Sequence, residues 1–179
     1  MANKVVALVG MCGAGKSVVT EWFKERGYAP VHFGDATMDE LAARKLPVNE
    51  TNEKAVREEL RQKHGMAAFA ILNLPRIEKS LAEGSVIVDG LYSWSEYRVL
   101  KDKFADALQV MAVFTPRALR YLRLSERQIR PLTDDQARNR DYAEIENIEK
   151  GGPIAIADFT VVNDGDHTHL YGQLEKTGL

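Results

Sequence analysis

The sequence predicts an α/β fold in which five short strands form a parallel sheet with helices on both faces. Two observations predict it: short, mainly apolar runs alternate with longer helical segments, and the first run, residues 4–9, is rich in valine, as in a strand buried on both faces. The chain of 179 residues is long enough to bury a sizeable core. We therefore expect one domain over residues 1–179.

Five apolar runs have the length of buried strands. The first is the most valine-rich, and the second ends at Gly34-Asp35. The third leads directly into Asp89-Gly90. The expected strands are residues 4–9, 30–33, 85–88, 108–114 and 159–162.

Helical spacing fills the intervals between these runs. Only helical signals occur from residue 38 to about 83, and Pro75 should kink or divide the last of these helices. We treat residues 36–83 as a helical insertion and the charge-dense residues 125–141 as a second one. The other expected helices are 16–26 before Gly27, 94–104, a segment begun by Pro116, 145–156 with a break at Gly151-Gly152, and a short closing helix.

Composition excludes several function classes. A formal net charge of −2 argues against broad electrostatic binding of nucleic acid. No apolar run approaches the ~18 residues that span a bilayer, and the N-terminus lacks the features of a signal peptide. The single cysteine, Cys12, permits no internal disulfide. We expect a cytoplasmic protein, monomeric or a small homo-oligomer, without nucleic-acid or membrane partners.

Residues 10–17, GMCGAGKS, satisfy the phosphate-loop pattern G-x-x-x-x-G-K-[ST] in full. Glycines let backbone N–H groups approach phosphate oxygens, and the following helix presents further free N–H groups. Lys16 can reach the β- and γ-phosphates, and the Ser17 hydroxyl suits Mg²⁺. Cys12 is either a small buried filler or a redox-sensitive thiol. The residues expected to bind the nucleotide here are Gly10, Gly13, Ala14, Gly15, Lys16, Ser17 and Val18.

Asp89 is the natural partner of this loop, because it ends a strand that should lie beside the first one. A carboxylate at the carboxyl edge of a parallel sheet can hold Mg²⁺ or its water. The alternative is a turn-forming Asp-Gly pair.

Other sequence motifs and the length of the chain indicate which class of phosphate-loop protein this is. Neither the guanine-reading N/T-K-x-D nor D-x-x-G occurs, which excludes a GTP switch, and a motor ATPase usually needs a longer chain. A small phosphotransferase needs an acceptor pocket, for which residues 36–83 are available, and a cationic lid. The lid arginines could equally form a solvated, salt-bridged helix pair; they are Arg123, Arg127, Arg130, Arg138 and Arg140.

The whole chain resembles the phosphate-loop family of small nucleotide and nucleoside kinases, and within it the dephospho-CoA kinases and archaeal-type adenylate-kinase-like proteins. Four stretches carry the resemblance: GMCGAGKS, RGYAPVHFGDATMDELAARKL, RLSERQIRPLTDDQARNRD and IADFTVVNDGDHTHLYGQLEK. The last is similar to the A-D-x-x-I-x-N-x-G ending of dephospho-CoA kinases. The resemblance implies a three-layer fold with sheet order 2-3-1-4-5.

The same resemblance implies roles for individual residues. Asp35 matches the acidic residue that serves dephospho-CoA kinases as the base for the ribose hydroxyl, although Gly-Asp before a helix is also a good N-cap. Lid arginines that contact ATP are matched by Arg123, Arg127 and Arg140. The loop against which adenine packs is matched by Asn163, Asp164 and Gly165.

Two departures concern the acceptor. Nucleoside monophosphate kinases grip the acceptor phosphate with arginines at places where this sequence has Met38 and Tyr92. Tyr92, Trp94 and Tyr97 could form a stacking wall for a base or anchor a helix in the core. Possible substitutes for the missing cations are Arg44, Arg57 and Arg61.

The sequence therefore predicts an ATP- and Mg²⁺-dependent kinase that acts on a small nucleotide-like acceptor. Ser17 and Asp89 would hold the metal, and the residues expected to be catalytic are Lys16, Asp35, Arg127 and Arg140. Dephospho-CoA is the first-ranked acceptor and a nucleoside monophosphate the second. The alternative from another class is a nucleotide-binding regulatory protein with slow ATPase activity.

Overall fold

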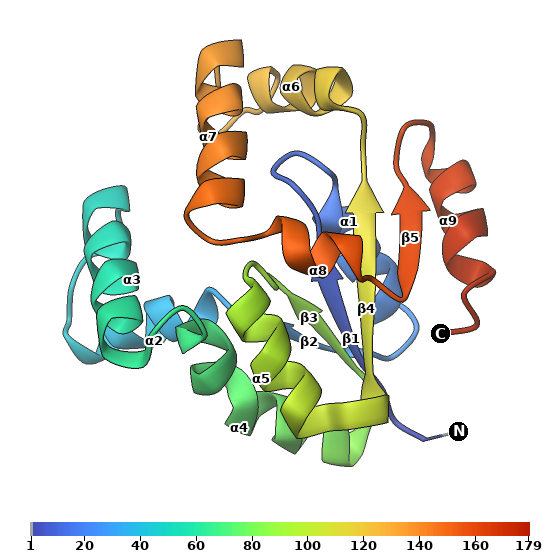
Figure 1. Ribbon diagram of the computed structural model, residues 1–179, viewed down its shortest axis with the longest axis horizontal. Coiled ribbons are helices and arrows are strands. Elements are labelled where there is room, and N and C mark those ends of the chain that lie inside the picture. The colour runs from blue at the N-terminus through green and yellow to red at the C-terminus, as the bar shows by residue number, and fades with distance from the viewer. Residues whose placement is uncertain (1) are drawn as a thin grey trace.

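Five parallel strands form one sheet in the computed structural model, which describes residues 2–179 (Figure 1). Their order is β2-β3-β1-β4-β5, so the predicted order is confirmed. Each strand lies within two residues of its predicted bounds. The strands are β1 (Val5–Val9), β2 (Ala29–His32), β3 (Val86–Asp89), β4 (Leu108–Phe114) and β5 (Phe159–Val162).

Strand β1 is the central strand, and all five of its residues are fully buried. Val5, Ala7 and Val9 pack into one core cluster, and Val6 and Leu8 pack into the other. A strand buried on both faces has no polar alternation, which is why its sequence is a continuous apolar run. In register, Leu8 pairs with Asp89 of β3 and with Met111 of β4.

Helices cover both faces of the sheet, as predicted (Figure 1). One face packs against α1 (Lys16–Lys24) and α9 (His167–Glu175). The opposite face packs against α4 (Ala68–Glu83), α5 (Trp94–Phe104), which a short 3₁₀ turn (Ala105–Ala107) follows, and α8 (Gly151–Ala155). Among residues 2–179, no helix has both the length and the apolar content that crossing a membrane requires.

Two helical hairpins flank the carboxyl edge of the sheet. The expected helical region 36–83 forms α2 (Asp35–Ala43), α3 (Glu50–His64) and α4. Of these, α4 lies on the sheet beside β2 and β3, whereas α2 and α3 extend from it (Figure 1). On the other side of the edge stand α6 (Arg117–Ser125) and α7 (Asp134–Glu146).

The prediction that Pro75 kinks or divides a helix is wrong as regards division, because α4 runs unbroken from Ala68 to Glu83. Proline removes the bond that the carbonyl of Ile71 would otherwise accept. Both residues lie on the exposed side of α4, where water can bond the freed carbonyl. An exposed proline is therefore tolerated inside this helix.

The predicted break at Gly151-Gly152 is also misplaced. Helix α7 ends at Glu146 and α8 begins at Gly151, so the interruption covers residues 147–150. Glu149 makes the turn with φ of 54°, and the N–H of Lys150 donates to the carbonyl of Glu144 at 3.1 Å. A Cβ at Gly152 would lie 3.0 Å from the Trp94 ring, so this glycine allows α8 to pack closely on α5.

Candidate functional site

The phosphate loop, residues 10–17, connects β1 to α1 at the carboxyl edge of the sheet (Figure 1). At Gly10, whose φ is +154°, a Cβ would lie 2.5 Å from the carbonyl oxygen of Val113. At Gly15, whose φ is +88°, a Cβ would lie 2.1 Å from Nδ2 of Asn163. The loop passes so close to β4 and to the end of β5 that only glycine fits at these two positions.

Asn163 supports the phosphate loop from behind. Its buried Nδ2 donates to the carbonyl of Ala14 at 2.9 Å. The hydroxyl of Thr115 lies 3.0 Å from the same carbonyl oxygen and 2.9 Å from the Asn163 carbonyl oxygen. The Asn163 side chain is therefore engaged with the loop, and neither it nor Gly165 lines the cavity in front of the loop.

A cavity of about 400 Å³ opens in front of the loop. It brings together eight residues predicted from the sequence, whereas Gly10, Ala14, Val18 and Asp35 do not line it. Cys12 is half-buried with a free thiol, and it lines the cavity as well. The predicted residues in the wall are Gly13, Gly15, Lys16, Ser17, Asp89, Arg123, Arg127 and Arg140, and the wall is completed by Cys12, Tyr92, Glu144 and Lys150.

The ammonium of Lys16 is folded onto its own loop. It donates to the carbonyl of Gly10 at 2.7 Å and lies 3.4 Å from the carbonyl oxygen of Met11. Burial lowers the pKa of Lys16, and the nearby carboxylates of Glu144 and Asp89 oppose this shift. These two carbonyl oxygens satisfy the ammonium where phosphate oxygens would otherwise do so.

Ser17 and Asp89 line the same cavity. The pairing of Asp89 with Leu8, near the end of β1, explains why this carboxylate lies beside the loop that follows β1. His32 of the neighbouring strand approaches it, with Nε2 3.9 Å from Oδ2. A hydroxyl and a carboxylate are the hard oxygen donors that Mg²⁺ prefers, so these residues fit that ion together with nucleotide phosphates. Residues 2–179 contain no group of three or more His, Cys, Asp or Glu side chains that could hold a metal by themselves.

Three arginines reach the cavity from the α6–α7 hairpin. Arg123 comes from α6, Arg127 from the connecting loop and Arg140 from α7. The other two arginines of the predicted lid do not line the cavity. Arg130 pairs with Glu50 of α3 at 2.8 Å, and Arg138 pairs with Asp135 at 2.7 Å. The hairpin is therefore divided between cavity-facing arginines and arginines bound to carboxylates elsewhere.

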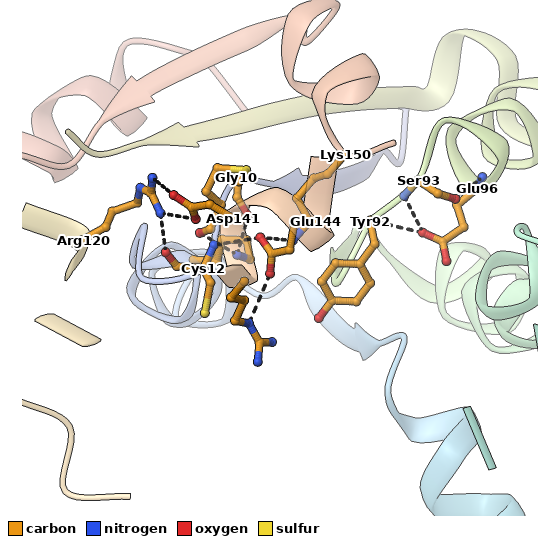
Figure 2. Close-up of polar contacts among 12 residues, drawn as sticks. Gly10, Cys12, Tyr92, Ser93, Glu96, Arg120, Asp141, Glu144 and Lys150 are labelled. Atoms are coloured by element: carbon orange, nitrogen blue, oxygen red, sulfur yellow. Dashed lines mark hydrogen bonds and ion pairs between the residues drawn. The ribbon is translucent and has the colours of Figure 1, made fainter. Parts of the chain in front are cut away.

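Glu144 and Lys150 are functional candidates that sequence reasoning missed (Figure 2). The Glu144 carboxylate accepts a hydrogen bond from the N–H of Cys12 at 3.1 Å and lies 2.7 Å from Nζ of Lys150. Its other oxygen lies 3.4 Å from Nε of Arg140. One carboxylate thus connects the phosphate loop with two cations, and no local pattern in the charge-dense segment distinguishes it.

Tyr92 lies in the wall of the cavity, two residues before the start of α5. Its ring lies below the Lys150 ammonium, 4.6 Å from centroid to Nζ, and burial raises its pKa to about 12. The N–H of Tyr92 donates to the buried carboxylate of Glu96 at 2.8 Å (Figure 2). Trp94 and Tyr97 pack against each other, with ring centroids 5.0 Å apart, and do not line the cavity. Of the three aromatic residues considered in the sequence, Tyr92 alone lies in its wall.

Asp35 is the first residue of α2, at the same sheet edge as the cavity. The N-cap of α2 is Gly34 and no side chain caps it, so the alternative reading of Asp35 as an N-cap is not what the structure has. Met38, on the same helix, is 39% exposed.

The arginines considered as substitutes for the acceptor clamp differ in their partners. Arg44 is paired with Glu40 and Glu59, and Arg57 with Glu50 and Glu53. Arg61 lies over the Phe69 ring and forms no ion pair within residues 2–179.

Comparison with known sequences identifies relatives over nearly the whole chain. Residues 6–150 match the model of the AAA domain family. The chain is similar to a UPF0200 protein of Thermococcus kodakarensis, with 32% identity over 177 residues that cover 96% of this chain and 95% of the relative. That name states no reaction.

Solved structures share the fold. The chain is similar to TT1252 from Thermus thermophilus, with a TM-score of 0.71, 14% identity and coverage of 99% of this chain and 97% of the other. It is also similar to the shikimate kinase of Bacteroides thetaiotaomicron, with a TM-score of 0.60, 13% identity and coverage of 97% and 96%. At these identities the likeness shows the fold alone: a phosphate-loop fold of the kinase type.

Proposed function

Since this chain belongs to the AAA domain family and to the UPF0200 proteins, and has a kinase-type phosphate-loop fold, we propose that it transfers the γ-phosphoryl group of ATP to a small nucleotide-like acceptor. The observation that carries the proposal is the composition of the cavity. Lys16, Ser17 and Asp89 meet three arginines of the α6–α7 hairpin around a space of about 400 Å³. Phosphoryl transfer depends on such positioning and charge neutralisation.

In the proposed reaction, an acceptor hydroxyl or phosphate oxygen attacks the γ-phosphorus. The new oxygen–phosphorus bond forms as the bond to the β,γ-bridging oxygen breaks, and ADP leaves with that electron pair. Lys16 would leave the carbonyl of Gly10 to bind the β- and γ-phosphates, while Arg127 and Arg140 neutralise charge on the transferred group. Ser17 and Asp89 would hold Mg²⁺, which when bound neutralises charge on the phosphate oxygens.

For a hydroxyl acceptor, the proton would pass to the carboxylate of Asp35. Asp35 follows β2 at the edge where His32 pairs with Asp89, so an acceptor between α2 and the cavity could reach both sides. Together with the ending IADFTVVNDG, this position supports dephospho-CoA as the first acceptor to test. A nucleoside monophosphate ranks second, because Met38 and Tyr92 provide no cation for its phosphate.

Transfer of labelled γ-phosphate from ATP to a panel of acceptors tests the proposal. The panel contains dephospho-CoA, the common ribo- and deoxyribonucleoside monophosphates, and free nucleosides. A single labelled product that Lys16→Ala abolishes is the expected result, and loss in Asp35→Asn would identify a hydroxyl acceptor. Wild-type turnover in Lys16→Ala would contradict the assignment.

A second function, slow ATP hydrolysis in a regulatory protein, is favoured by the acceptor side of the site. Arg44 and Arg57 are already bound to glutamates, so neither is available as an acceptor clamp without losing those partners. This function predicts that label appears only as free phosphate, at one slow rate with every acceptor in the panel. Asp35→Asn would then leave nucleotide affinity nearly unchanged.

A further inference from the structure

Lys150 is a buried cation in the wall of the phosphate cavity. The residue is 0% exposed, yet it shares that wall with Lys16, Ser17 and Asp89. Its ammonium lies 2.7 Å from Oε2 of Glu144 and 4.6 Å from the centroid of the Tyr92 ring (Figure 2). Burying a cation is unfavourable unless an anion stays beside it, so the partner of Lys150 decides whether its position is tolerated.

The backbone conformation around Lys150 directs its side chain toward the interior of the protein. The preceding residue, Glu149, has φ of 54°, a conformation that residues other than glycine adopt only where the surroundings impose it. The N–H of Lys150 is bonded to the carbonyl of Glu144, and Gly152 lies against Trp94 two residues later. The short α7–α8 connection is therefore fixed on both sides of Lys150.

The anion beside Lys150 is bonded to the backbone of the phosphate loop. Glu144 accepts a hydrogen bond from the N–H of Cys12, and Cys12 belongs to the segment that matches the phosphate-loop pattern. The same carboxylate contacts Arg140, another cation of the cavity. Glu144 thus occupies a position that suits one oxygen of a bound anion, with a backbone donor and two cations around it.

A nucleotide in the loop would change this arrangement. Its phosphates would compete with Glu144 for the Cys12 N–H and would repel the carboxylate. Lys150 would then face the cavity with its partner displaced, and the nearest replacement anion is the phosphate chain itself. An exchange of carboxylate for phosphate keeps the buried ammonium paired in both states.

We propose that Lys150 is a further catalytic residue, whose ammonium contacts the γ-phosphoryl group of bound ATP after exchanging Glu144 for it. The proposal rests on the function proposed above. Lys150 keeps its proton throughout: the acceptor oxygen bonds to phosphorus, the bond to the bridging oxygen breaks, and the ammonium neutralises the charge on the transferred group. Glu144 is the positioning residue that holds Lys150 when the loop is empty.

The test compares ATP with ADP, which lacks only the γ-phosphate. Dissociation constants for both are measured by calorimetry in wild type, Lys150→Met, the double variant Glu144→Gln/Lys150→Met and the control Lys54→Met, whose lysine is exposed on α3. We expect Lys150→Met to lose about 10- to 100-fold of the preference for ATP over ADP. The control should keep the wild-type ratio.

The double variant separates catalysis from charge pairing. In Lys150→Met alone, Glu144 loses its closest cation, and the protein could fail for that reason. Removing one positive and one negative charge leaves the net charge of the site unchanged. If Lys150 is only structural, the double variant should therefore regain the wild-type ratio of ATP to ADP affinity. We expect the ratio to stay lowered. If Lys150→Met does not fold, the double variant carries the test.

The outcomes distinguish the two proposals. The role of Lys150 is overturned if wild type binds ATP and ADP equally well. It is also overturned if the double variant keeps the wild-type ratio of ATP to ADP affinity. Both results hold whether or not an acceptor is phosphorylated. If the wild-type protein labels no acceptor, the proposed function is overturned. A lower preference for ATP over ADP in the Lys150 variants would still place the Lys150 ammonium on the γ-phosphate. Where an acceptor is labelled, kcat should fall in both variants more than the KM for ATP rises.

Discussion

Arg120 and Asp141 form a buried two-bond ion pair that joins α6 to α7. Nη1 lies 2.7 Å from Oδ1 and Nη2 lies 2.7 Å from Oδ2, and the two side chains are only 7% and 8% exposed. Nη1 of Arg120 also donates to the carbonyl of Cys12 at 3.1 Å. The hairpin that carries the cavity arginines is therefore attached to the phosphate loop by a pair that does not itself line the cavity.

Asp141→Asn should lower the free energy of unfolding by about 3 kcal/mol, because it leaves the buried Arg120 without its counter-charge. Urea denaturation measures the loss. Asp135→Asn removes the partner of Arg138 on the exposed face of the same helix and should cost less than about 1 kcal/mol. Similar losses in the two variants would show that the buried pair is not the anchor of the hairpin.

Gly15→Ala should abolish nucleotide binding, and Gly27→Ala is its control. The two glycines have nearly the same positive φ, 88° and 87°, so alanine meets left-handed backbone strain at both. At Gly27 nothing lies within 4 Å of the added Cβ, and strain alone should cost about 1 kcal/mol. At Gly15 the Cβ would meet the Asn163 amide that holds the loop. Calorimetric titration with ATP should show binding by Gly27→Ala only.

Glu96 should make stability fall as pH rises from about 4.5 to 7. Burial raises its pKa from 4.5 to about 7, so the folded protein binds more protons than the unfolded chain in that interval, and the free energy of unfolding declines as pH increases. Glu96→Gln keeps an oxygen for the N–H groups of Tyr92 and Ser93 and removes the charge. The variant should gain about 1–3 kcal/mol over wild type between pH 4.5 and pH 8. Parallel curves of stability against pH would contradict this role.

ATP affinity should weaken above pH 8. The pKa of Lys150 is lowered to about 8, chiefly by burial; Glu144 opposes this shift and the nearby Lys16 contributes to it. Only the protonated amine attracts phosphate, so the dissociation constant for ATP should rise by up to about tenfold per pH unit above that value. The pKa of Tyr92, about 12, lies outside this range. A Lys150→Met protein whose ATP affinity falls as steeply with pH would assign the effect to another group.

The sequence predicts those parts of the molecule whose structure depends on neighbouring residues in the chain. The apolar run of β1 predicts a buried strand, and the glycines and lysine of residues 10–17 predict the phosphate loop. The position of Asp89 beside that loop is also predictable, because parallel strands end at the same edge of the sheet. The α7 segment DDQARNRDYAEIE has few apolar residues, so nothing in it indicates which face is buried. For this reason the sequence predicts Arg138 among the lid arginines and does not reveal the buried contacts of Asp141 and Glu144.

Two other differences arise from tertiary contacts that lie far apart in the sequence. Gly152 lies within α8 and packs against Trp94, whereas a pair of glycines in the sequence suggests a break in the helix. Asn163 holds the carbonyl of Ala14, a contact across 149 residues that no pattern near either residue reveals. Eight residues of the cavity wall were therefore predictable from the sequence, whereas the contacts of Glu144 and Lys150 within that wall were not.

The central place of β1 in the sheet has a consequence for synthesis of the chain. Val5 pairs with Val86 and Leu108, so this strand leaves the ribosome about 80 to 100 residues before its partners. At ~5–20 residues per second, the delay is on the order of 10 s. During this delay the β1 segment VVALV, which is uncharged and strongly β-forming, has no partner strand. The charge of the adjacent Lys4 opposes pairing of this segment between nascent chains. Chains that end before β4 cannot complete this strand's pairing, so they should depend on chaperones and be the forms most prone to aggregate.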